Sequence, residues 1–529
     1  MCLDTPNQLT QQKLQPKFAW CVKTHTATYL LRDESKKKVT GMPSPSSQAG
    51  NQFDFEQRRQ FLKGVALGAG SLGLTQLLSD QGLLNDAAAA ADPQLLEPRE
   101  SHYAPTAKRI IWLFMPGSPS QVDTFDYKPE LQHCNGNKLE GADPKTGFFT
   151  TSGKVLASPF KFRQHGESGA HTSQIFPHIS KHVDDMAFIY SCFSQSNNHT
   201  PAMLEMNSGM FLQGRPCVGS WVTYGLGAEN QNLPGFVVMH GAMPRGGKPI
   251  WSPGFLPKVY QPTSIDGRSA TPISDLTRLK TMDDKQQRAQ LDVLRAMNAK
   301  HQRLRPHEAD LSARLESFEL AYRMQTAAPE AMDVTRESEE THKAYGVGQK
   351  ETDLVAKQCI TARRLVERGV RFVQLYAGTN GGGGGVADVP WDGHSDIKLN
   401  HSIAAKSVDQ PIGALLADLK GRGMLEDTLV IWGGEFGRTS DSQGSNGRDH
   451  NPNAFTMWMA GGGIKGGVQY GASDEFGYKA VENRVGVNDL HATILHLMGI
   501  NHERLTYRFN GRDYRLTDVA GSVLHEILA

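Results

Sequence analysis

Short apolar runs that alternate with helical patterns constrain the fold of this chain more than any other feature of its sequence. Each run is rich in β-branched and aromatic residues and has the length of one buried strand. The runs predicted to be strands are 108–115, 186–193, 235–240, 370–377, 428–432 and 455–463. Strands and helices in alternation form βαβ units. The sequence therefore predicts an α/β protein with a parallel-rich sheet sandwiched by helices.

A second pattern predicts helices beyond those that connect the strands. Residues 275–326 are rich in Leu, Ala, Arg, Gln and Glu, and their apolar residues are spaced by three and four. This spacing is typical of helices. We expect a helical insertion around 275–345 that lies over the sheet or extends from it as a cap.

Charge and cysteine content exclude two kinds of function. The chain of 529 residues has a formal net charge of +1 and no long basic stripe, so nucleic acid is not an expected partner. Cys134, Cys192, Cys217 and Cys359 follow the first 91 residues without C-x-x-C spacing. A cysteine zinc site is therefore not expected.

The N-terminal part is unlike the remainder. Residues 1–53 are polar and lack periodicity, which predicts a disordered extension. Residues 54–91 resemble a twin-arginine signal, with Arg58-Arg59 before an apolar stretch and small residues at 87–91. The alternative is an amphipathic helix after a basic turn. Met42 would give a signal of conventional length, so we expect the natural start there.

The signal predicts the location and one partner of the protein. We expect export through the twin-arginine translocase to the periplasm or cell envelope. Since no later segment reaches about 18 apolar residues, no membrane span is expected in the mature form. Residues 105–529 would form the functional domain.

Polar residues follow most of the predicted strands, and Arg448, Asp449 and His450 come just before the run 455–463. Ligands of parallel sheets bind at the carboxyl ends of the strands. Carboxylates and imidazoles are ligands of zinc and other divalent metals. A helix N-terminus with arginines nearby suits a tetrahedral anion such as phosphate or sulfate. The candidates are Asp123, Asp126, His199, Thr200, Asp392, His394, Glu435, Arg438, Arg448, Asp449 and His450.

Several of these residues have structural alternatives. Asp123 and Asp126 could cap helices or close turns, and Asp392 with His394 could be solvated beside a glycine-rich loop. Arg438 could simply pair with Glu435. His401, His491 and His496 are interpreted as packing or surface histidines. Asp449-His450 is the strongest pair, because it lies between turns just before the run 455–463.

Four longer stretches resemble the domain-of-unknown-function 1501 family. They are "FMPGSPSQVDTFDYKPEL", "GSWVTYGLGAENQNLPGFVV", "EFGRT…GRDHNPNAFTMWMAGGGIKGG" and "GYKAVENRVGVNDLHATILHLMGINHERLTYRFNGRDYRLTDV". Proteins of that family are exported by the twin-arginine route and are often labelled sulfatases in planctomycete-type bacteria. The family is distantly similar to the alkaline phosphatase superfamily. The resemblance implies an alkaline phosphatase/sulfatase-like fold with a dinuclear-type metal site.

The resemblance also implies roles for individual residues. Asp392 and His394 occupy the place of one metal's ligands, and His450 that of a late histidine ligand. Glu435 lies where the superfamily has the Asp of an Asp-His pair. His199 falls at the nucleophile position of sulfatases, and Thr200 lies next to it.

The sequence departs from the superfamily at three points. It has no C-x-P-x-R motif, and Phe436 replaces the histidine expected after Glu435. The stretch "MPGSPS" replaces the early Asp, for which Asp123 or Asp126 could substitute. One metal site is therefore better supported than two.

From these residues we expect an exported, metal-dependent hydrolase-like protein that acts on sulfate or phosphate esters. Asp392, His394 and His450 would hold a divalent Zn, Ca or Mg ion, joined by Glu435 and Asp123. Thr200 or His199 would attack or position the anion, and Arg438 and Arg448 would bind its oxygens. The alternative is an inactive superfamily member that binds sulfated polysaccharide or a cell-envelope partner.

Overall fold

The computed structural model describes residues 95–143, 145–304, 309–377 and 391–529. The predicted N-terminal extension and signal lie outside these residues. No helix in the described part of the chain combines the length and the apolar character that crossing a bilayer requires.

A nine-stranded sheet forms the centre of the fold, in the order β12-β4-β11-β8-β1-β7-β5-β6, with β15 also paired to β4. Only β11 runs antiparallel to its neighbours β8 and β4, whereas the other pairs are parallel. The strands are β1 (Arg109–Phe114), β4 (Met186–Phe193), β5 (Phe236–His240), β6 (Thr263–Asp266), β7 (Phe372–Tyr376), β8 (Thr428–Gly433), β11 (Phe455–Ala460), β12 (Val468–Tyr470) and β15 (Val485–Gly486). The predicted parallel-rich α/β class is confirmed.

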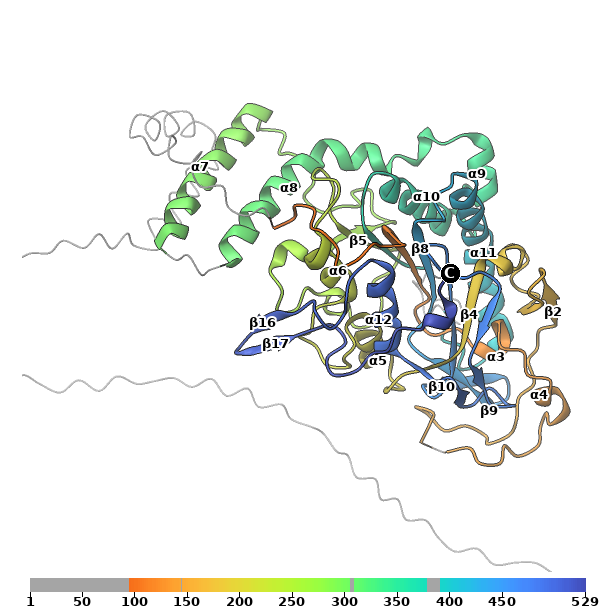
Figure 1. The fold of residues 1–529 in the computed structure, drawn as a ribbon. Helices are drawn as coiled ribbons and strands as arrows, with labels where there is room; N and C mark the ends of the chain where they lie inside the picture. The colour runs from red at the N-terminus through yellow and green to blue at the C-terminus, as the bar shows by residue number, and fades with distance from the viewer. Residues whose placement is uncertain (1–94, 144, 305–308, 378–390) are drawn as a thin grey trace, which may run out of the picture. The chain divides into compact units, whose positions relative to one another are not determined.

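Helices cover both faces of the sheet. Figure 1 shows the strands between α10 and α11 on one side and α5, α6 and α12 on the other. The alternation of side chains along the strands explains this, since Gln374 of β7 bonds to Asn207 of α5, whereas Trp432 of β8 packs on Trp391 before α11. The helices are α5 (His199–Ser208), α6 (Val218–Leu226), α10 (Asp353–Glu367), α11 (Ile397–Gly421) and α12 (Val487–Leu497).

Shorter elements surround this sandwich. The hairpin of β9 (Gly437–Gln443) and β10 (Gly447–Asn451) follows β8 directly and carries candidate site residues. The remaining short elements are α3 (Gln121–Thr124), α4 (Glu130–His133), β2 (Phe162–His165), β3 (Ala170–Ser173), β13 (Ala472–Ser473), β14 (Ala480–Glu482), β16 (Tyr507–Phe509), β17 (Arg512–Tyr514), and the 3-10 helices η2 (Ile179–Asp185), η3 (Lys248–Trp251), η4 (Lys258–Tyr260) and η6 (His525–Ile527).

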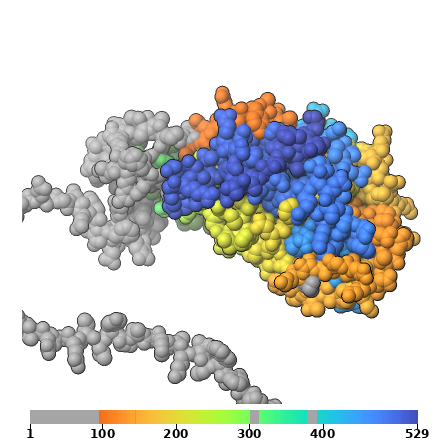
Figure 2. Space-filling model, turned by 60° about the horizontal axis from the view of Figure 1, so that its bottom comes forward, coloured from red at the N-terminus to blue at the C-terminus, as the bar shows by residue number. Residues whose placement is uncertain are grey.

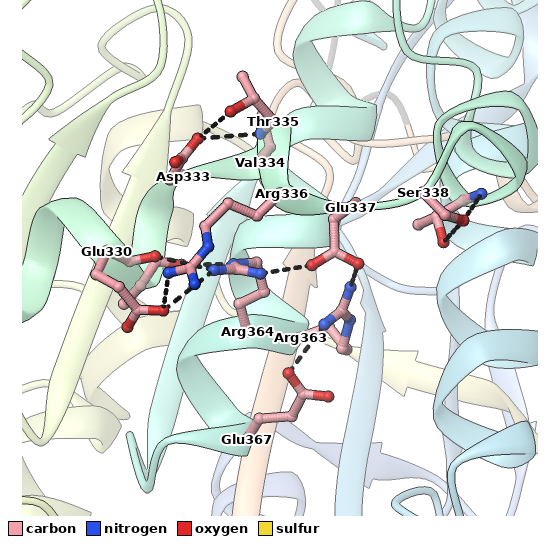
Figure 3. A network of polar contacts seen from close by, with 12 residues as sticks. Glu330, Asp333, Val334, Thr335, Arg336, Glu337, Ser338, Arg363, Arg364 and Glu367 are labelled. Atoms are coloured by element: carbon pink, nitrogen blue, oxygen red, sulfur yellow. Dashed lines mark hydrogen bonds and ion pairs between the residues drawn. The ribbon is translucent and has the colours of Figure 1, made fainter.

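The predicted helical insertion consists of α7 (Asp284–Leu304), α8 (Ala309–Met332), η5 (Val334–Arg336) and α9 (Glu339–Tyr345). Buried ion pairs attach its end to the core (Figure 3). Glu337 accepts hydrogen bonds from Arg363 and Arg364 of α10, both at 2.6 Å. Arg363 also reaches Glu367 at 2.9 Å. Burial raises the pKa of Glu337, but the two arginines lower it further, so the net shift is downward.

Replacing Glu337 by Gln should destabilise the protein at neutral pH by about 3 kcal/mol, because two buried guanidinium groups lose a shared carboxylate. Since the pKa of Glu337 is lowered in the folded state, the loss should shrink as the pH falls below the usual carboxyl range. Urea unfolding of wild type, Glu337→Gln and the exposed control Glu339→Gln measures this. Equal stability of both variants would contradict the anchoring role.

Candidate metal centre

Four polar segments meet beyond the carboxyl ends of the parallel strands. His199 is the first residue of α5, which follows β4, and Glu435 is the second residue after β8. Asp392 and His394 lie between β7 and α11, and His450 lies on β10. The apolar strands are buried in the core, and the polar residues that follow them lie at one edge of the sheet. These residues therefore lie at the edge of the sheet where the parallel strands end.

Three histidine side chains converge on one carboxylate oxygen of Asp392. The Oδ1 atom of Asp392 lies 2.7 Å from His394 Nε2, 3.2 Å from His199 Nε2 and 3.3 Å from His450 Nε2. One ligand atom from each residue lies within 4.8 Å of all the others. The side chains of His199, Asp392 and His450 are almost fully buried, and that of His394 is 22% exposed. We call these four residues the His-Asp cluster.

The outer nitrogen of each imidazole in the cluster faces an oxygen acceptor. Nδ1 of His199 lies 2.6 Å from Glu435 Oε1, and Nδ1 of His450 lies 2.6 Å from the backbone oxygen of Asn197. Nδ1 of His394 lies 2.5 Å from Gln443 Oε1. Carbonyl and carboxylate oxygens only accept, so each Nδ1 carries the hydrogen. In the neutral rings the Nε2 lone pairs then point to the centre of the cluster.

The pKa shifts follow from burial and from the two carboxylates. Burial lowers the pKa of His450 to about 3, so this ring is neutral at physiological pH. Burial also lowers the pKa of His199, but Asp392 and Glu435 outweigh it and raise the pKa overall. For Asp392 burial raises the pKa, while Arg438 and the three histidines lower it far below its usual range. The carboxylate is therefore ionised.

The chemistry of the cluster fits a divalent metal ion. His199 Nε2 and Glu435 Oε2 are buried and have no hydrogen-bond partner. Lone pairs of imidazoles that face a carboxylate oxygen repel it unless a cation lies between them. Three imidazole nitrogens with one carboxylate oxygen are a donor set that suits zinc and similar transition ions. Among the described residues this is the one group of three or more potential ligands that converges.

Glu435 lies one hydrogen bond outside the cluster. It is fully buried, and its Oε1 atom accepts from the backbone N–H of Gly117 at 3.0 Å as well as from His199. A carboxylate that holds the far nitrogen of a ligand histidine fixes the ring and raises its basicity. Phe436 packs against the rings of His199 and His450, with centroids 4.9 and 4.7 Å apart. A phenyl ring thus fills the position where the resemblance implied a second histidine.

The structure places Arg438 beside the cluster, with each of its three nitrogens bonded to a protein acceptor. This arginine is fully buried and donates to Asp392 Oδ1 at 2.7 Å, to the backbone oxygens of Ser118 and Arg448 at 3.1 and 3.4 Å, and to that of Gly117. It neutralises the carboxylate and fixes the loop after β1 against the hairpin. Its partner is therefore Asp392 rather than Glu435.

Arg448 and Asp123 lie away from the cluster and pair with each other. The guanidinium contacts both oxygens of Asp123, at 2.7 and 3.3 Å, and both side chains are fully buried. Arg448 also donates to the backbone oxygens of Thr439, Ser440 and Leu156. This pair holds α3, the hairpin and the loop at residue 156 together. Asp126, the other acid considered, pairs with Lys128 at 3.0 Å.

Backbone strain and packing hold Asp392 in place. Trp391 has a positive φ of 55°, a conformation that bulky residues rarely adopt. Its fully buried ring packs against Trp432 and His401, which stabilises this conformation. On the other side, the backbone N–H of Arg448 bonds to the oxygen of Gly393 at 3.0 Å. The segment that carries Asp392 and His394 is therefore held between the core and the hairpin.

Arg245 is a site residue that the sequence analysis missed. It follows β5, its side chain is 58% exposed, and its Nη2 atom lies 3.4 Å from Asp392 Oδ2. The next residue, Gly246, has a positive φ of 87°, and a Cβ there would lie 3.2 Å from Thr200 Cγ2. Thr200 is half-buried in the first turn of α5, where Asn198 caps its N–H. The strand-end rule, applied to β5, would have identified Arg245.

Glu205 supports the site from within α5. Its carboxylate accepts from the backbone N–H of Gln195 at 3.0 Å, which fixes the loop that leads to His199. Burial raises the pKa of Glu205 from 4.5 to about 7, and the Gln195 hydrogen bond opposes this only in part. The folded protein therefore binds this proton more tightly than the unfolded chain does.

Stability should fall as the pH rises from about 4.5 to about 7, because Glu205 must ionise in a buried place. Replacing it by Gln keeps an acceptor for Gln195 and removes this titration. The difference in unfolding free energy between about pH 5 and about pH 8 should be smaller in Glu205→Gln, by about 3 kcal/mol at most. Urea titrations of both proteins measure it, and parallel pH profiles would contradict the assignment.

Solved structures with similar folds share little sequence with the chain. PsFucS1 sulfatase from Pseudoalteromonas sp. shows 13% identity over 80% of this chain and 72% of its own, with a TM-score of 0.33. Phosphonate monoester hydrolase SpPMH from Silicibacter pomeroyi shows 12% over 80% and 76%, with a TM-score of 0.33. A Mg-bound TAB5 alkaline phosphatase variant shows 11% over 75% and 99%, with a TM-score of 0.31. Scores this low carry no argument about activity.

The sequence itself decides the family. None of the curated proteins compared with the chain matches it. The model of the family described as "Protein of unknown function (DUF1501)" matches residues 107–528, which is nearly the whole predicted functional domain. The chain belongs to the DUF1501 family, as its sequence motifs predicted.

Proposed function

We propose that this protein is a metal-dependent hydrolase-like enzyme for sulfate or phosphate esters, with the ion held by the His-Asp cluster. One observation carries the proposal: three imidazoles, each anchored at Nδ1, direct Nε2 at a single carboxylate oxygen. Such orientation by outer hydrogen bonds is characteristic of metal-ligand histidines. Export through the twin-arginine route belongs to the same proposal and is supported by the sequence of residues 54–91.

The donor set narrows the choice of ion. Calcium and magnesium prefer oxygen ligands, whereas this cluster offers three nitrogens and one oxygen. We therefore favour zinc or a similar transition ion over the calcium or magnesium also considered from the sequence. When bound, such an ion supplies Lewis-acid stabilisation of ester oxygens and lowers the pKa of a hydroxyl that it contacts.

Side chains of the protein would bind the anion, orient the ligand and supply the nucleophile. Arg245 is the exposed cation beside the cluster, and it can pair with the oxygens of a sulfate or phosphate group. Glu435 keeps His199 oriented, so His199 acts as a ligand rather than as the nucleophile. Thr200, the next residue, is the candidate nucleophile. Attack of its hydroxyl oxygen on sulfur or phosphorus would form a Thr200 ester and break the bond to the substrate's alkoxide, and the hydroxyl proton would pass to that oxygen so that the alcohol leaves. Water would then cleave the Thr200 ester, release sulfate or phosphate and restore the hydroxyl.

Metal analysis tests the centre. Purified protein should hold about one transition ion per chain, and His450→Ala or His394→Ala should lose it, because each removes one of the four ligands. The exposed His133 provides the control, since His133→Ala removes an imidazole far from the cluster in the sequence and leaves the metal content unchanged. Wild-type protein that contains no metal and gains no stability from added zinc would refute the centre.

Turnover of 4-nitrophenyl sulfate and 4-nitrophenyl phosphate tests the reaction. Thr200→Ala should reduce kcat by about 100-fold or more, whereas Thr200→Ser should retain much of it, because serine keeps the hydroxyl. Arg245→Gln should raise KM by about 10-fold through the loss of a charged contact to the anion. A Thr200→Ala enzyme as active as wild type would exclude Thr200 as the nucleophile.

A second candidate function is an inactive member that binds sulfated polysaccharide or a cell-envelope partner. It is favoured by the burial of Arg438 and Arg448, because every guanidinium nitrogen of the two already donates to a protein acceptor. Neither arginine is placed to stabilise a transition state, which leaves Arg245 as the cation for the anion. Metal-loaded wild type that binds sulfated polysaccharide but hydrolyses neither ester would support this second function.

A further inference from the structure

Two adjacent phenylalanines flank the His-Asp cluster and remain open to solvent. Phe148 and Phe149 are 48% and 50% exposed, and their rings meet edge to face with centroids 5.0 Å apart. A pair of large apolar rings at the surface loses the stabilisation that burial would give. Apolar surface of this kind beside a polar centre is typical of a ligand site.

The rings contact the ligand histidines themselves. The Phe149 ring lies edge to face with the imidazole of His394, with centroids 5.0 Å apart. The Phe148 ring lies 5.7 Å from the imidazole of His450. Anything that reaches the cluster along this side therefore passes the two phenyl rings.

Asp449, which is buried, and Asn197, which is partly buried, hold this loop through hydrogen bonds. The N–H of Phe149 donates to Asp449 Oδ2 at 2.5 Å, and Asn197 Nδ2 donates to the backbone oxygen of Gly147 at 2.9 Å. A Cβ at Gly147 would lie 2.5 Å from Asp449 Oδ2, so this close approach requires glycine. Figure 2 shows the orange segment that includes this loop packed beside blue, C-terminal segments. The two rings are thus presented on a preformed surface.

A charged side chain, Arg245, also lies beside the cluster, in addition to the two phenyl rings. Arg245 approaches Oδ2 of Asp392, whereas the three histidines face Oδ1. A ligand that uses both neighbours has an anionic group for Arg245 and the ion, and an apolar face for the phenyl rings. Aromatic rings bind other ring faces through stacking or edge contacts.

We propose that Phe148 and Phe149 form the recognition surface for the ester's organic group, and that this group is a ring, such as an aryl group or a sugar. The inference rests on the proposed function, because it assigns the leaving-group side of the same site. It makes these two residues determinants of specificity: they select ring-bearing esters over alkyl esters without taking part in bond cleavage.

Binding of two non-hydrolysable anions tests this in the zinc-loaded full chain. Calorimetric titration should show that phenylphosphonate binds about 5-fold more tightly than methylphosphonate, since only the phenyl compound offers a ring face. In Phe148→Ala/Phe149→Ala the ratio should fall to about 1, because only phenylphosphonate loses contacts with its ring. Phe149→Leu keeps apolar bulk without a ring face and should give an intermediate ratio. A sugar phosphonate, which is equally non-hydrolysable, is titrated in parallel, and whichever ring compound loses affinity in the double variant identifies the ring that the two phenylalanines bind.

Phe318→Ala is the matched control, because Phe318 is 37% exposed on α8 and belongs to the helical insertion. It should leave the ratio unchanged. Ring preference without turnover of any ester would uphold this inference and refute the hydrolase. Equal binding of both phosphonates by wild type, or an unchanged ratio in the double variant, would overturn the inference while leaving the hydrolase in place. Failure to bind either anion would overturn both.

Discussion

The Oδ1 atom of Asp392 is the point on which the geometry of the site depends. Three imidazoles and the guanidinium of Arg438 all lie within 3.3 Å of it. These groups come from α5, the segment before α11, and both strands of the hairpin. One ionised carboxylate therefore determines how four parts of the chain approach each other. A neutral residue at this position would leave a buried guanidinium without its counter-charge.

Two buried arginines, Arg438 and Arg448, join the loops and the hairpin around the site. Arg438 and Arg448 donate mostly to backbone oxygens of loops and of the hairpin, and such loops have few backbone partners of their own. Each arginine is also paired with an acid, Asp392 or Asp123, which offsets the cost of burying its charge. Sequence reasoning assigned both to the substrate because arginines near ligand residues often bind anions. Their complete burial instead supports a role in building the site.

The features of this structure that can be predicted from the sequence are those that a local pattern of residues encodes. Apolar runs such as 109–114 and 428–433 identify strands because burial on both faces requires nearly continuous apolar side chains. The rule that sites lie at strand ends then selected Asp392, His394 and His450. The strand β10 was missed, since "GRDHN" is polar although all five residues are buried. Its side chains are buried through pairing with distant residues, and no local pattern encodes that.

Other residues of the site could not be identified from the sequence for the same reason, because no local pattern encodes their contacts. Asn197, Gln443 and the phenylalanines at 148–149 act through contacts with residues far along the chain. His199 was among the polar residues found after a predicted strand, and the family resemblance then placed it at the nucleophile position. Its place among the cluster residues depends on Glu435, which lies 236 positions away. Long-range hydrogen bonds of this kind become visible only when the sheet has brought the strand ends together.

The hydrogen bond between Asn197 and His450 joins residues 253 positions apart. A cluster built across such a separation does not exist in either half of the chain alone, because neither half carries the complete donor set. All four ligands would therefore be available to an ion only after the chain has folded, and the ion would then join the segments that follow β4, β7 and β8. In the cell, the compartment where the chain folds would therefore also decide which metal it acquires.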